Sequence, residues 1–200
     1  RTSSLRKLHS PYESIIGKWR QGGRYPRPVT RFSVRSLRLR PGQEHHESLR
    51  LVIEPLVLGG ETYHTSPPET PAELVVQRAA TGDLYRLRLS TRLDGPCMRC
   101  LAPASLSVDV DAQEYEATDA AADEELGSEY VADGELDAGA WARDQVALGL
   151  PDQILCRPGC AGLCPICGKD LNVEPHEHAE EGVDPRWAAL EAFGTETPDT

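Results

Sequence analysis

The chain has 200 residues, of which 39% are hydrophobic and 26% charged, and its formal net charge is −11. This composition is typical of a globular protein with a sizeable core, and no stretch approaches the 18 consecutive apolar residues that predict a membrane span. The first residues lack the apolar run of a secretory signal. We therefore expect a reducing, cytoplasmic compartment, in which six cysteines indicate metal ligands rather than disulfides.

The charge is distributed unevenly along the chain. Residues 1–50 contain 12 Lys and Arg against 3 Asp and Glu, whereas residues 51–200 contain 9 against 29. Residues 1–30 show little periodicity, and we expect them to form a disordered basic extension. A basic arm on an acidic body suggests contact with nucleic acid. A functionless extension, an organellar transit peptide or sequence upstream of the true start would give the same composition.

Most of the expected structure is β-strand, beginning near Phe32. The clearest signal lies in residues 82–96 and 105–117, where apolar and polar residues alternate on either side of a Gly/Pro/Cys connection, as in an antiparallel hairpin. The weaker predictions are a bulged strand over residues 32–40, a turn over 41–47, a strand over 48–60 interrupted at Pro55, a loop over 66–71 and a strand over 72–80.

The second half of the chain begins with an acidic segment, residues 116–136, which we interpret as a linker or mobile flap. Asp137 is expected to cap a helix that ends before Pro151, and Asp184 to cap a second helix over residues 185–193. Residues 195–200 are expected to be a disordered tail. The predicted fold class is α+β: one domain, residues 31–194, in which an antiparallel β-sheet carries a zinc-bound C-terminal lobe and two short helices.

Eight potential metal ligands occur as four close pairs. They are Cys97 and Cys100, Cys156 and Cys160, Cys164 and Cys167, and His176 and His178. A C-x2-C turn directs two thiolates at one point, and a glycine directly after it, as at Gly168, permits the tight turn. We therefore predict Zn²⁺ as the cofactor, in the segment 156–178 and on the hairpin.

Two pairing schemes are possible. In the first, both cysteine pairs up to Cys160 form one site, and the remaining cysteines and histidines form a second. In the second scheme, the four cysteines from Cys156 to Cys167 form a single site and the hairpin pair is left over. A closed thiolate site indicates a structural metal. The histidine-containing site, with Glu174 and Glu177 nearby, leaves room for a catalytic water, so a zinc-dependent hydrolase is an alternative.

The motif order resembles the bacterial YceD family over roughly residues 32–194. The similarity lies in "CMRCL", an acidic spacer, "LGLP", "CRPGCAGLCPICGKDLN" and "DPRWAAL". This resemblance implies a non-enzymatic ribosome-biogenesis factor for accumulation or processing of large-subunit ribosomal RNA, with that RNA or its precursor, and possibly a large-subunit ribosomal protein, as partners. Many relatives carry C-x-C where this chain has His176-Glu-His178. No catalytic residue is predicted.

An acidic body repels phosphate, so RNA contact requires a local basic surface. The candidates are Arg86, Arg88 and Arg92 on one face of the hairpin, with Arg99 between its cysteines; Arg35, Arg38, Arg40 and Arg50 are possible additions, and Tyr85 and Trp19 are possible stacking partners. Alternatively, these arginines form the wet side of a sheet and are balanced by Asp109 and Asp111. An acidic adaptor that binds a ribosomal protein is the rival function.

Overall fold

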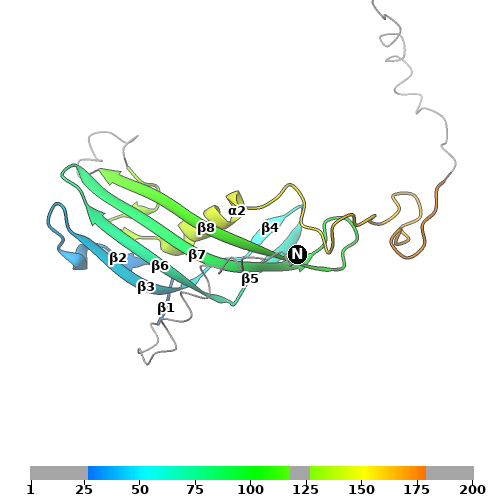
Figure 1. Cartoon of the computed structure of the whole chain (residues 1–200), viewed down its shortest axis with the longest axis horizontal. Coiled ribbons are helices and arrows are strands. Elements are labelled where there is room, and N and C mark those ends of the chain that lie inside the picture. The colour runs from blue at the N-terminus through cyan, green and yellow to red at the C-terminus, as the bar shows by residue number, and fades with distance from the viewer. Residues whose placement is uncertain (1–26, 118–126, 179–200) are drawn as a thin grey trace, which may run out of the picture. The chain divides into compact units, whose positions relative to one another are not determined.

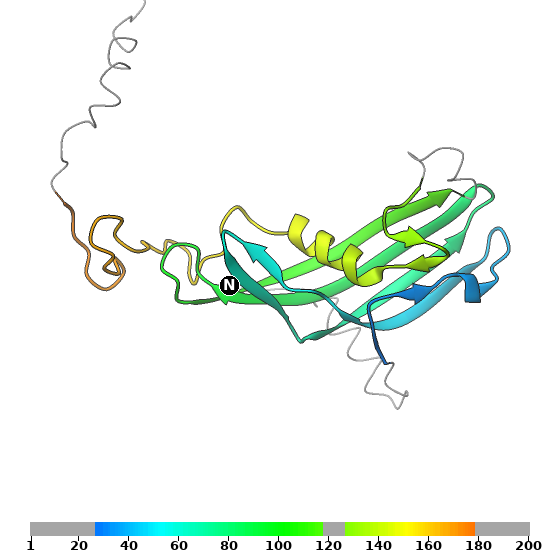
Figure 2. The ribbon, with the colours of Figure 1, turned by 180° about the vertical axis from the view of Figure 1, so that it is seen from behind.

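The computed structural model describes residues 27–117 and 127–178 of the chain (Figures 1 and 2). The chain forms two compact units, Arg1–Cys160 and Ala161–Thr200. All of the described strands and the described α-helix belong to the first unit. The described part of the second unit is a compact loop structure with one isolated bridge, between Leu163 and Asp170.

The first unit is built largely from antiparallel strands. Its elements are β1 (Pro28–Val29), β2 (Phe32–Ser33), the 3-10 turn η1 (Arg35–Leu37), β3 (Glu44–Val52), β4 (Leu56–Leu58), β5 (Glu61–Ser66), β6 (Glu69–Arg78), β7 (Gly82–Pro96), β8 (Pro103–Ala117), β9 (Val131–Ala132), β10 (Glu135–Leu136) and α2 (Ala138–Leu148). The main sheet has the order β1-β3-β6-β7-β5-β4. In addition, β8 pairs with the edge of β7 opposite β6 and β5. β2, β10 and β9 form a second, small sheet.

The β7–β8 hairpin is the central element of this unit and confirms the strongest sequence prediction. The two strands have 15 residues each and pair along their whole length, from Gly82 opposite Ala117 to Pro96 opposite Pro103. The other edge of β7 is shared by β6 over its first half and by β5 near its end. Among the described strands, only β1 runs parallel to its neighbour, β3.

One face of the sheet forms the core. Because side chains alternate along a strand, Tyr85, Leu87, Leu89 and Leu93 of β7 all point to the same side, where each is at most 2% exposed. Helix α2 lies along this face, in contact with β8 and β3 (Figure 2). Its Trp141 is fully buried there. Burying each such large side chain contributes about 1.5–3 kcal/mol to the stability of the fold, so this packing holds the helix against the inner face of the sheet.

The helix predicted after residue 137 is confirmed. Asp137 caps it, since its Oδ1 accepts a hydrogen bond from the Ala140 backbone N–H at 3.0 Å, and the helix ends at Leu148, before Pro151. The second predicted helix, residues 185–193, lies outside the described residues, as do residues 1–26 and the tail. None of the described helices is long and apolar enough to cross a membrane.

The prediction for residues 32–40 is wrong beyond Ser33. The chain leaves the strand there because the backbone N–H groups of Val34 and Arg35 both donate to the carbonyl oxygen of Gly134, at 3.0 and 3.3 Å, and a 3-10 turn follows. Two connections were also predicted too long. β3 begins inside the expected turn, at Glu44, and β6 begins inside the expected loop, at Glu69.

The acidic segment 116–136 differs from the predicted linker at both ends. β8 continues to Ala117, and β9 and β10 form a short antiparallel pair over Val131–Leu136 that joins β2. Residues 118–126 lie outside the described residues. Glu116 and Tyr130 account for part of this order, because the Glu116 carboxylate accepts from the Ser128 N–H at 2.5 Å and the Tyr130 hydroxyl donates to Asp144 at 3.2 Å.

Candidate metal centres

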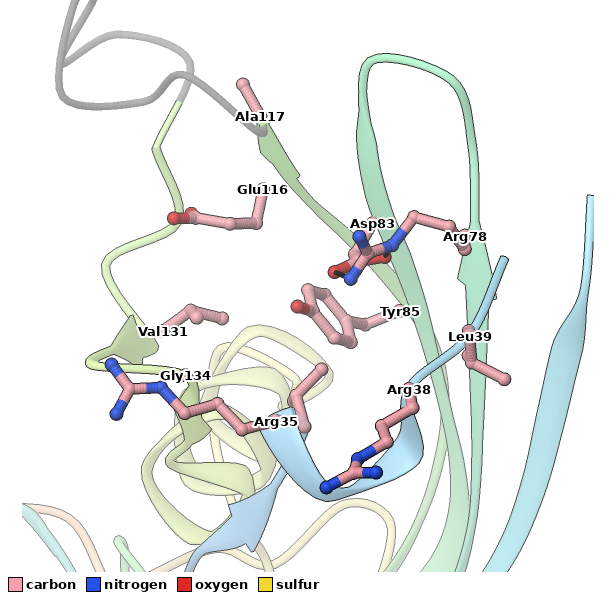
Figure 3. Close-up of a pocket in the computed structure, with 11 residues that line it drawn as sticks. Arg35, Arg38, Leu39, Arg78, Asp83, Tyr85, Glu116, Ala117, Val131 and Gly134 are labelled. Carbon is pink, nitrogen blue, oxygen red and sulfur yellow. Dashed lines mark hydrogen bonds and ion pairs between the residues drawn. The ribbon is translucent and has the colours of Figure 1, made fainter. Parts of the chain in front are cut away.

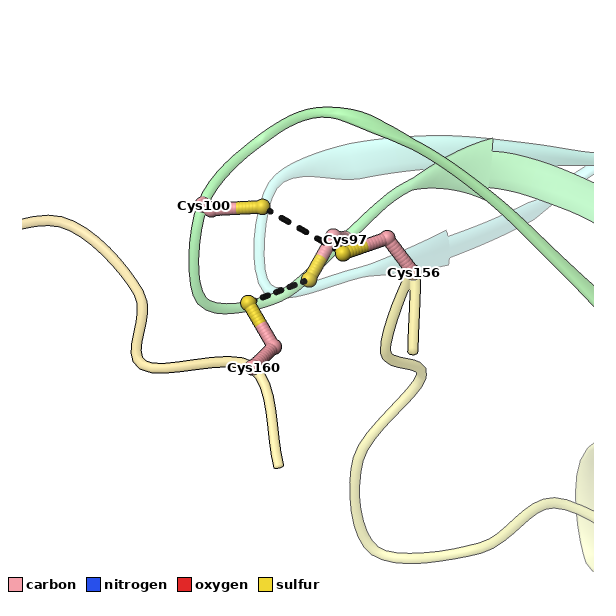
Figure 4. A group of neighbouring side chains, drawn as sticks. All are labelled: Cys97, Cys100, Cys156 and Cys160. Carbon is pink, nitrogen blue, oxygen red and sulfur yellow. Dashed lines mark hydrogen bonds between the residues drawn. The ribbon is translucent and has the colours of Figure 1, made fainter. Parts of the chain in front are cut away.

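The first cysteine pair lies in the connection between β7 and β8. The Cys97 N–H donates to the Ala102 carbonyl at 2.7 Å, and the Leu101 N–H returns to the Cys97 carbonyl at 2.9 Å. Leu101 adopts a φ of 62°, in the left-handed region that side-chain-bearing residues rarely occupy. This tight knuckle turns the side chains of Cys97 and Cys100 toward the same point (Figure 4).

The second pair comes from the segment after α2, which the knuckle holds by hydrogen bonds. The Met98 N–H donates to the Ile154 carbonyl at 2.9 Å. The Arg99 guanidinium donates to Gln153 Oε1 at 2.9 Å and to the Cys160 carbonyl at 3.0 Å. Ile154 is 1% exposed, so it anchors this segment in the core. Cys156 and Cys160 thus reach the knuckle from a separate part of the chain.

Together these four sulfur atoms form a compact cluster (Figure 4). Cys97 Sγ lies 3.9 Å from Cys160 Sγ, Cys100 Sγ lies 3.6 Å from Cys156 Sγ, and all four atoms lie within 4.8 Å of one another. No disulfide joins any of the six cysteines. A tetrahedron of sulfurs bonded to zinc at 2.3 Å has edges of about 3.8 Å, so the donor set and its spacing fit a zinc ion.

The backbone around the cluster favours a thiolate. Burial alone raises the pKa of Cys97, but the backbone N–H groups of Arg99, Cys100 and Cys156 outweigh it and lower that pKa to about 6. For Cys156, burial and then the hydrogen bonds with the other three thiols raise the pKa to about 12. The pKa of Cys100 is raised as well, so a metal-free cluster holds a negative charge at Cys97 easily, whereas Cys100 and Cys156 need a nearby cation to lose their protons.

The second cluster lies wholly within the second unit. The Cys164 N–H donates to the Lys169 carbonyl and the Gly168 N–H to the Cys164 carbonyl, both at 2.8 Å, and Gly168 has a φ of 73° that suits glycine. This is the turn that the C-x2-C-Gly motif predicts. The N–H groups of Cys167 and then Ile166 lower the pKa of Cys164 to about 6.

The two histidines complete this second set of donors. His176 Nε2 lies 3.1 Å from Cys167 Sγ, and its Nδ1 lies 2.8 Å from the Glu174 carbonyl oxygen. A proton on Nδ1 donates to that carbonyl, which leaves Nε2 as the metal ligand. The His178 ring lies 4.9 Å from the His176 ring, and all four ligand atoms lie within 4.8 Å of one another. The eight donors thus gather as the first pairing scheme assigned them.

The arginines predicted to contact RNA are engaged within the protein. Arg86 makes two hydrogen bonds to Asp111, at 2.6 and 2.7 Å, and Arg88 lies 3.5 Å from the same carboxylate. Arg92 pairs with Asp94 at 3.1 Å. This face carries the cross-strand ion pairs of the alternative interpretation, with Asp111 as the main partner; Asp109 instead accepts from the Ser90 hydroxyl.

Other predicted contact residues have structural positions as well. Arg99 holds the two cysteine segments together, and Tyr85 is 1% exposed, so its ring is not available to stack on a base. Trp19 lies outside the described residues. The partners of the knuckle, Gln153 for the Arg99 side chain and Ile154 for the Met98 backbone, were not identified from sequence. The only sequence feature that pointed to them was their position between the expected end of the helix and Cys156.

The fold and site thus define a β-sheet protein with a thiol cluster at the end of its main hairpin and a second, mixed Cys/His cluster. The chain belongs to the YceD family: the family model described as "Large ribosomal RNA subunit accumulation protein YceD" matches residues 85–194. The matched region begins in β7 and includes all eight candidate ligands.

The similar curated proteins are themselves uncharacterized. Relatives from Mycobacterium tuberculosis and Mycobacterium bovis are 38% identical over 130 residues, which is 62% of this chain and 62% of each relative. A relative from Mycobacterium leprae is 36% identical over 110 residues, or 52% of this chain and 50% of the relative. The chain therefore spans less than two thirds of the relatives it matches. No solved structure matched it significantly.

Proposed function

We propose that this chain is a non-catalytic ribosome-biogenesis factor that supports the accumulation of large-subunit ribosomal RNA, with structural zinc at both clusters. The family description supports the role in RNA accumulation. The observation that carries the zinc proposal is the gathering of four thiols from two distant segments, without a disulfide, at tetrahedral spacing. Zinc would hold the segment after α2 against the knuckle by a second means besides the Arg99 hydrogen bonds.

The donor count supports a structural rather than a catalytic metal. A catalytic zinc usually has three protein ligands and keeps one position open for water, whereas each cluster here offers four donors. Cys97 and Cys160 are also fully buried, which shields the first cluster from a substrate. A hydrolase would convert precursor ribosomal RNA to products in vitro. We expect the purified chain to leave that RNA intact.

We expect two zinc ions per chain in native mass spectrometry of the purified protein, because two separate four-donor clusters are present. The double variant Cys97→Ser/Cys160→Ser should retain one zinc ion, and Cys164→Ser/Cys167→Ser should retain the other. A metal-free wild-type chain, or a first variant that still carries two ions, would contradict the proposal.

The cellular role is tested by depleting the protein in its native host and measuring the ratio of large-subunit to small-subunit ribosomal RNA. We expect this ratio to fall, and to recover when the wild-type chain is expressed again. An unchanged ratio in depleted cells would contradict the proposed function.

A second candidate is an acidic adaptor for a basic ribosomal protein. The observation in its favour is the excess of acidic residues after residue 50, 29 against 9 basic ones. An adaptor would retain its ribosomal protein when a tagged chain is purified from lysate treated with ribonuclease. Loss of all ribosomal components after that treatment would favour direct action on RNA.

A further inference from the structure

A pocket of about 350 Å³ lies in the first unit, at the end of the β7–β8 hairpin far from the thiols (Figure 3). It is bounded by η1, by the ends of β6, β7 and β8, and by the β9–β10 turn. Its polar lining consists of Arg35, Arg38, Arg78, Asp83, Tyr85 and Glu116. The apolar remainder includes Val34, Leu39 and Val131.

Two of the lining arginines carry a positive charge that no described residue balances. Arg35 and Arg38 are exposed, and neither side chain makes an ion pair or hydrogen bond to any residue within 27–117 or 127–178. Arg86 and Arg88 of the hairpin face, by contrast, both bind carboxylates. Guanidinium groups without a partner are the groups best suited to grip a phosphate, which they bind through paired N–H donors.

The pocket also contains a hydroxyl donor, on a side chain that is otherwise buried. The Tyr85 side chain is 1% exposed, yet its hydroxyl has no hydrogen-bond partner among the residues that the structure describes. Figure 3 shows this hydroxyl pointing into the pocket. Burial, reinforced by the charge of Asp83, raises the pKa of Tyr85, so the hydroxyl keeps its proton and remains a donor. The hydroxyl is open to the pocket, where it can donate to an acceptor atom of a ligand.

The two carboxylates in the pocket are already occupied. Asp83 forms a two-pronged ion pair with Arg78, in which Nη2 lies 2.8 Å from Oδ2. Glu116 accepts the Ser128 backbone N–H at 2.5 Å. Arg78 neutralises Asp83, and Glu116 keeps its charge but forms no ion pair with Arg35 or Arg38 among the described residues. Three arginines against two carboxylates leave the lining with a formal charge of +1.

The backbone holds the two arginines in position. Arg38 has a φ of 46°, a left-handed conformation that is uncommon for a residue with a side chain and that tends to occur at functional sites. Gly134, at a φ of 71°, accepts the Val34 and Arg35 N–H groups, and a Cβ at Gly134 would overlap the Arg35 side chain. This turn therefore leaves room for Arg35 beside the pocket.

We propose that this pocket binds a phosphate group of single-stranded RNA, with Arg35 and Arg38 as its charged ligands and the Tyr85 hydroxyl as a further donor. The proposal rests on the proposed role in ribosomal RNA accumulation and moves the RNA contact away from the ion-paired hairpin face. A chain with a net charge of −11 repels RNA in general, so binding needs such a local site. The volume suits one nucleotide rather than a duplex.

The test is fluorescence anisotropy of a labelled single-stranded RNA oligonucleotide with the full, zinc-loaded chain at several salt concentrations. We expect Arg35→Gln/Arg38→Asn to weaken binding by about tenfold or more and to reduce the salt slope by about 0.7, the value for one lost phosphate contact on a single strand. Asn is chosen at position 38 because it tolerates the left-handed backbone. The double lysine variant at the same positions should recover part of the affinity.

The matched control is Arg86→Gln/Arg88→Gln, which removes the same charge from the ion-paired face and should change affinity by less than about twofold. The proposal is overturned if the control weakens binding as much as the pocket variant, or if the wild-type chain binds no RNA. Binding of inorganic phosphate or a nucleoside monophosphate, but not of RNA, would also overturn it. These assays use purified components and test only the pocket. The ribosomal RNA ratio in depleted cells tests the cellular role, so failure of one proposal can be told from failure of the other.

Discussion

A single side chain, Arg99, joins two segments that lie far apart in sequence. Its guanidinium donates to Gln153 and to the Cys160 carbonyl, and it projects from the same knuckle as Cys97 and Cys100. Hydrogen bonds from a charged donor contribute more than neutral ones, about 1.5–3 kcal/mol. The thiol cluster is thus preorganised by an arginine that shares the cysteine motif.

The ion pairs on the hairpin face give a residue-scale prediction about pH. The hydrogen bonds from Arg86, followed by the charges of Arg86 and Arg88, lower the pKa of Asp111. A lowered carboxyl pKa contributes stability that is present above the unfolded value near 4 and is lost as pH falls through the folded value. Because Asp111 is half exposed, we expect Asp111→Asn to cost no more than about 1 kcal/mol at pH 7.

Urea denaturation at pH 7 and at pH 3 measures this effect. The difference in unfolding free energy between wild type and Asp111→Asn should shrink at pH 3. Asp109→Asn is the control, since Asp109 binds a serine hydroxyl and has no arginine partner among the described residues. An equal loss for both variants at both pH values would show that the Arg86 pair contributes nothing specific.

The role of a residue could be predicted from sequence where the spacing between residues determines the chemistry. The C-x2-C pairs and the Gly after Cys167 specified the knuckles, because such turns depend on local backbone geometry alone. The partners of Arg86, Arg88 and Arg99 depend on register and on a segment more than 50 residues away. For that reason the basic stripe left two alternatives open, RNA contact or balance by Asp109 and Asp111, and the structure has the ion pairs with Asp111.

Among the elements, the β7–β8 hairpin and α2 carry the organisation of the first unit. Alternation along β7 and β8 is strict, so their pairing could be read from sequence. β3 and β6 were predicted too short because their first residues are polar or proline. β2 and β10 have two residues each and form only through long-range pairing, Phe32 with Leu136, which no local pattern reveals.

Helix α2 provides a prediction at this scale. Asp137 accepts the Ala140 N–H and also lies 3.3 Å from Arg31. We expect Asp137→Ala to lower the free energy of unfolding by about 1 kcal/mol, since the first helical turn loses its cap. Asp137→Asn keeps a capping oxygen and should lose less. Chemical denaturation of the three proteins tests this, and equal stability of the Ala and Asn variants would contradict the capping role.

At the scale of the whole molecule, we expect the sheet's core to be independent of the proposed zinc and the thiol-bearing segments to depend on it. The large buried side chains of β6, β7 and α2 lie outside the clusters. Treatment with a strong zinc chelator should therefore expose the amides of residues 97–102 and 153–160 to hydrogen exchange while those of β6 and the middle of β7 stay protected. Global loss of protection would contradict this division. Re-addition of zinc is the control.

The two candidate sites of the first unit lie near opposite ends of one strand. Cys97 directly follows β7 and lies 12 positions after Tyr85, which at the usual rise amounts to about 40 Å. The strand thus separates the proposed RNA pocket from the proposed zinc site of the first unit. We therefore expect an oxidant that removes zinc from the proposed thiol site to leave the proposed RNA pocket intact.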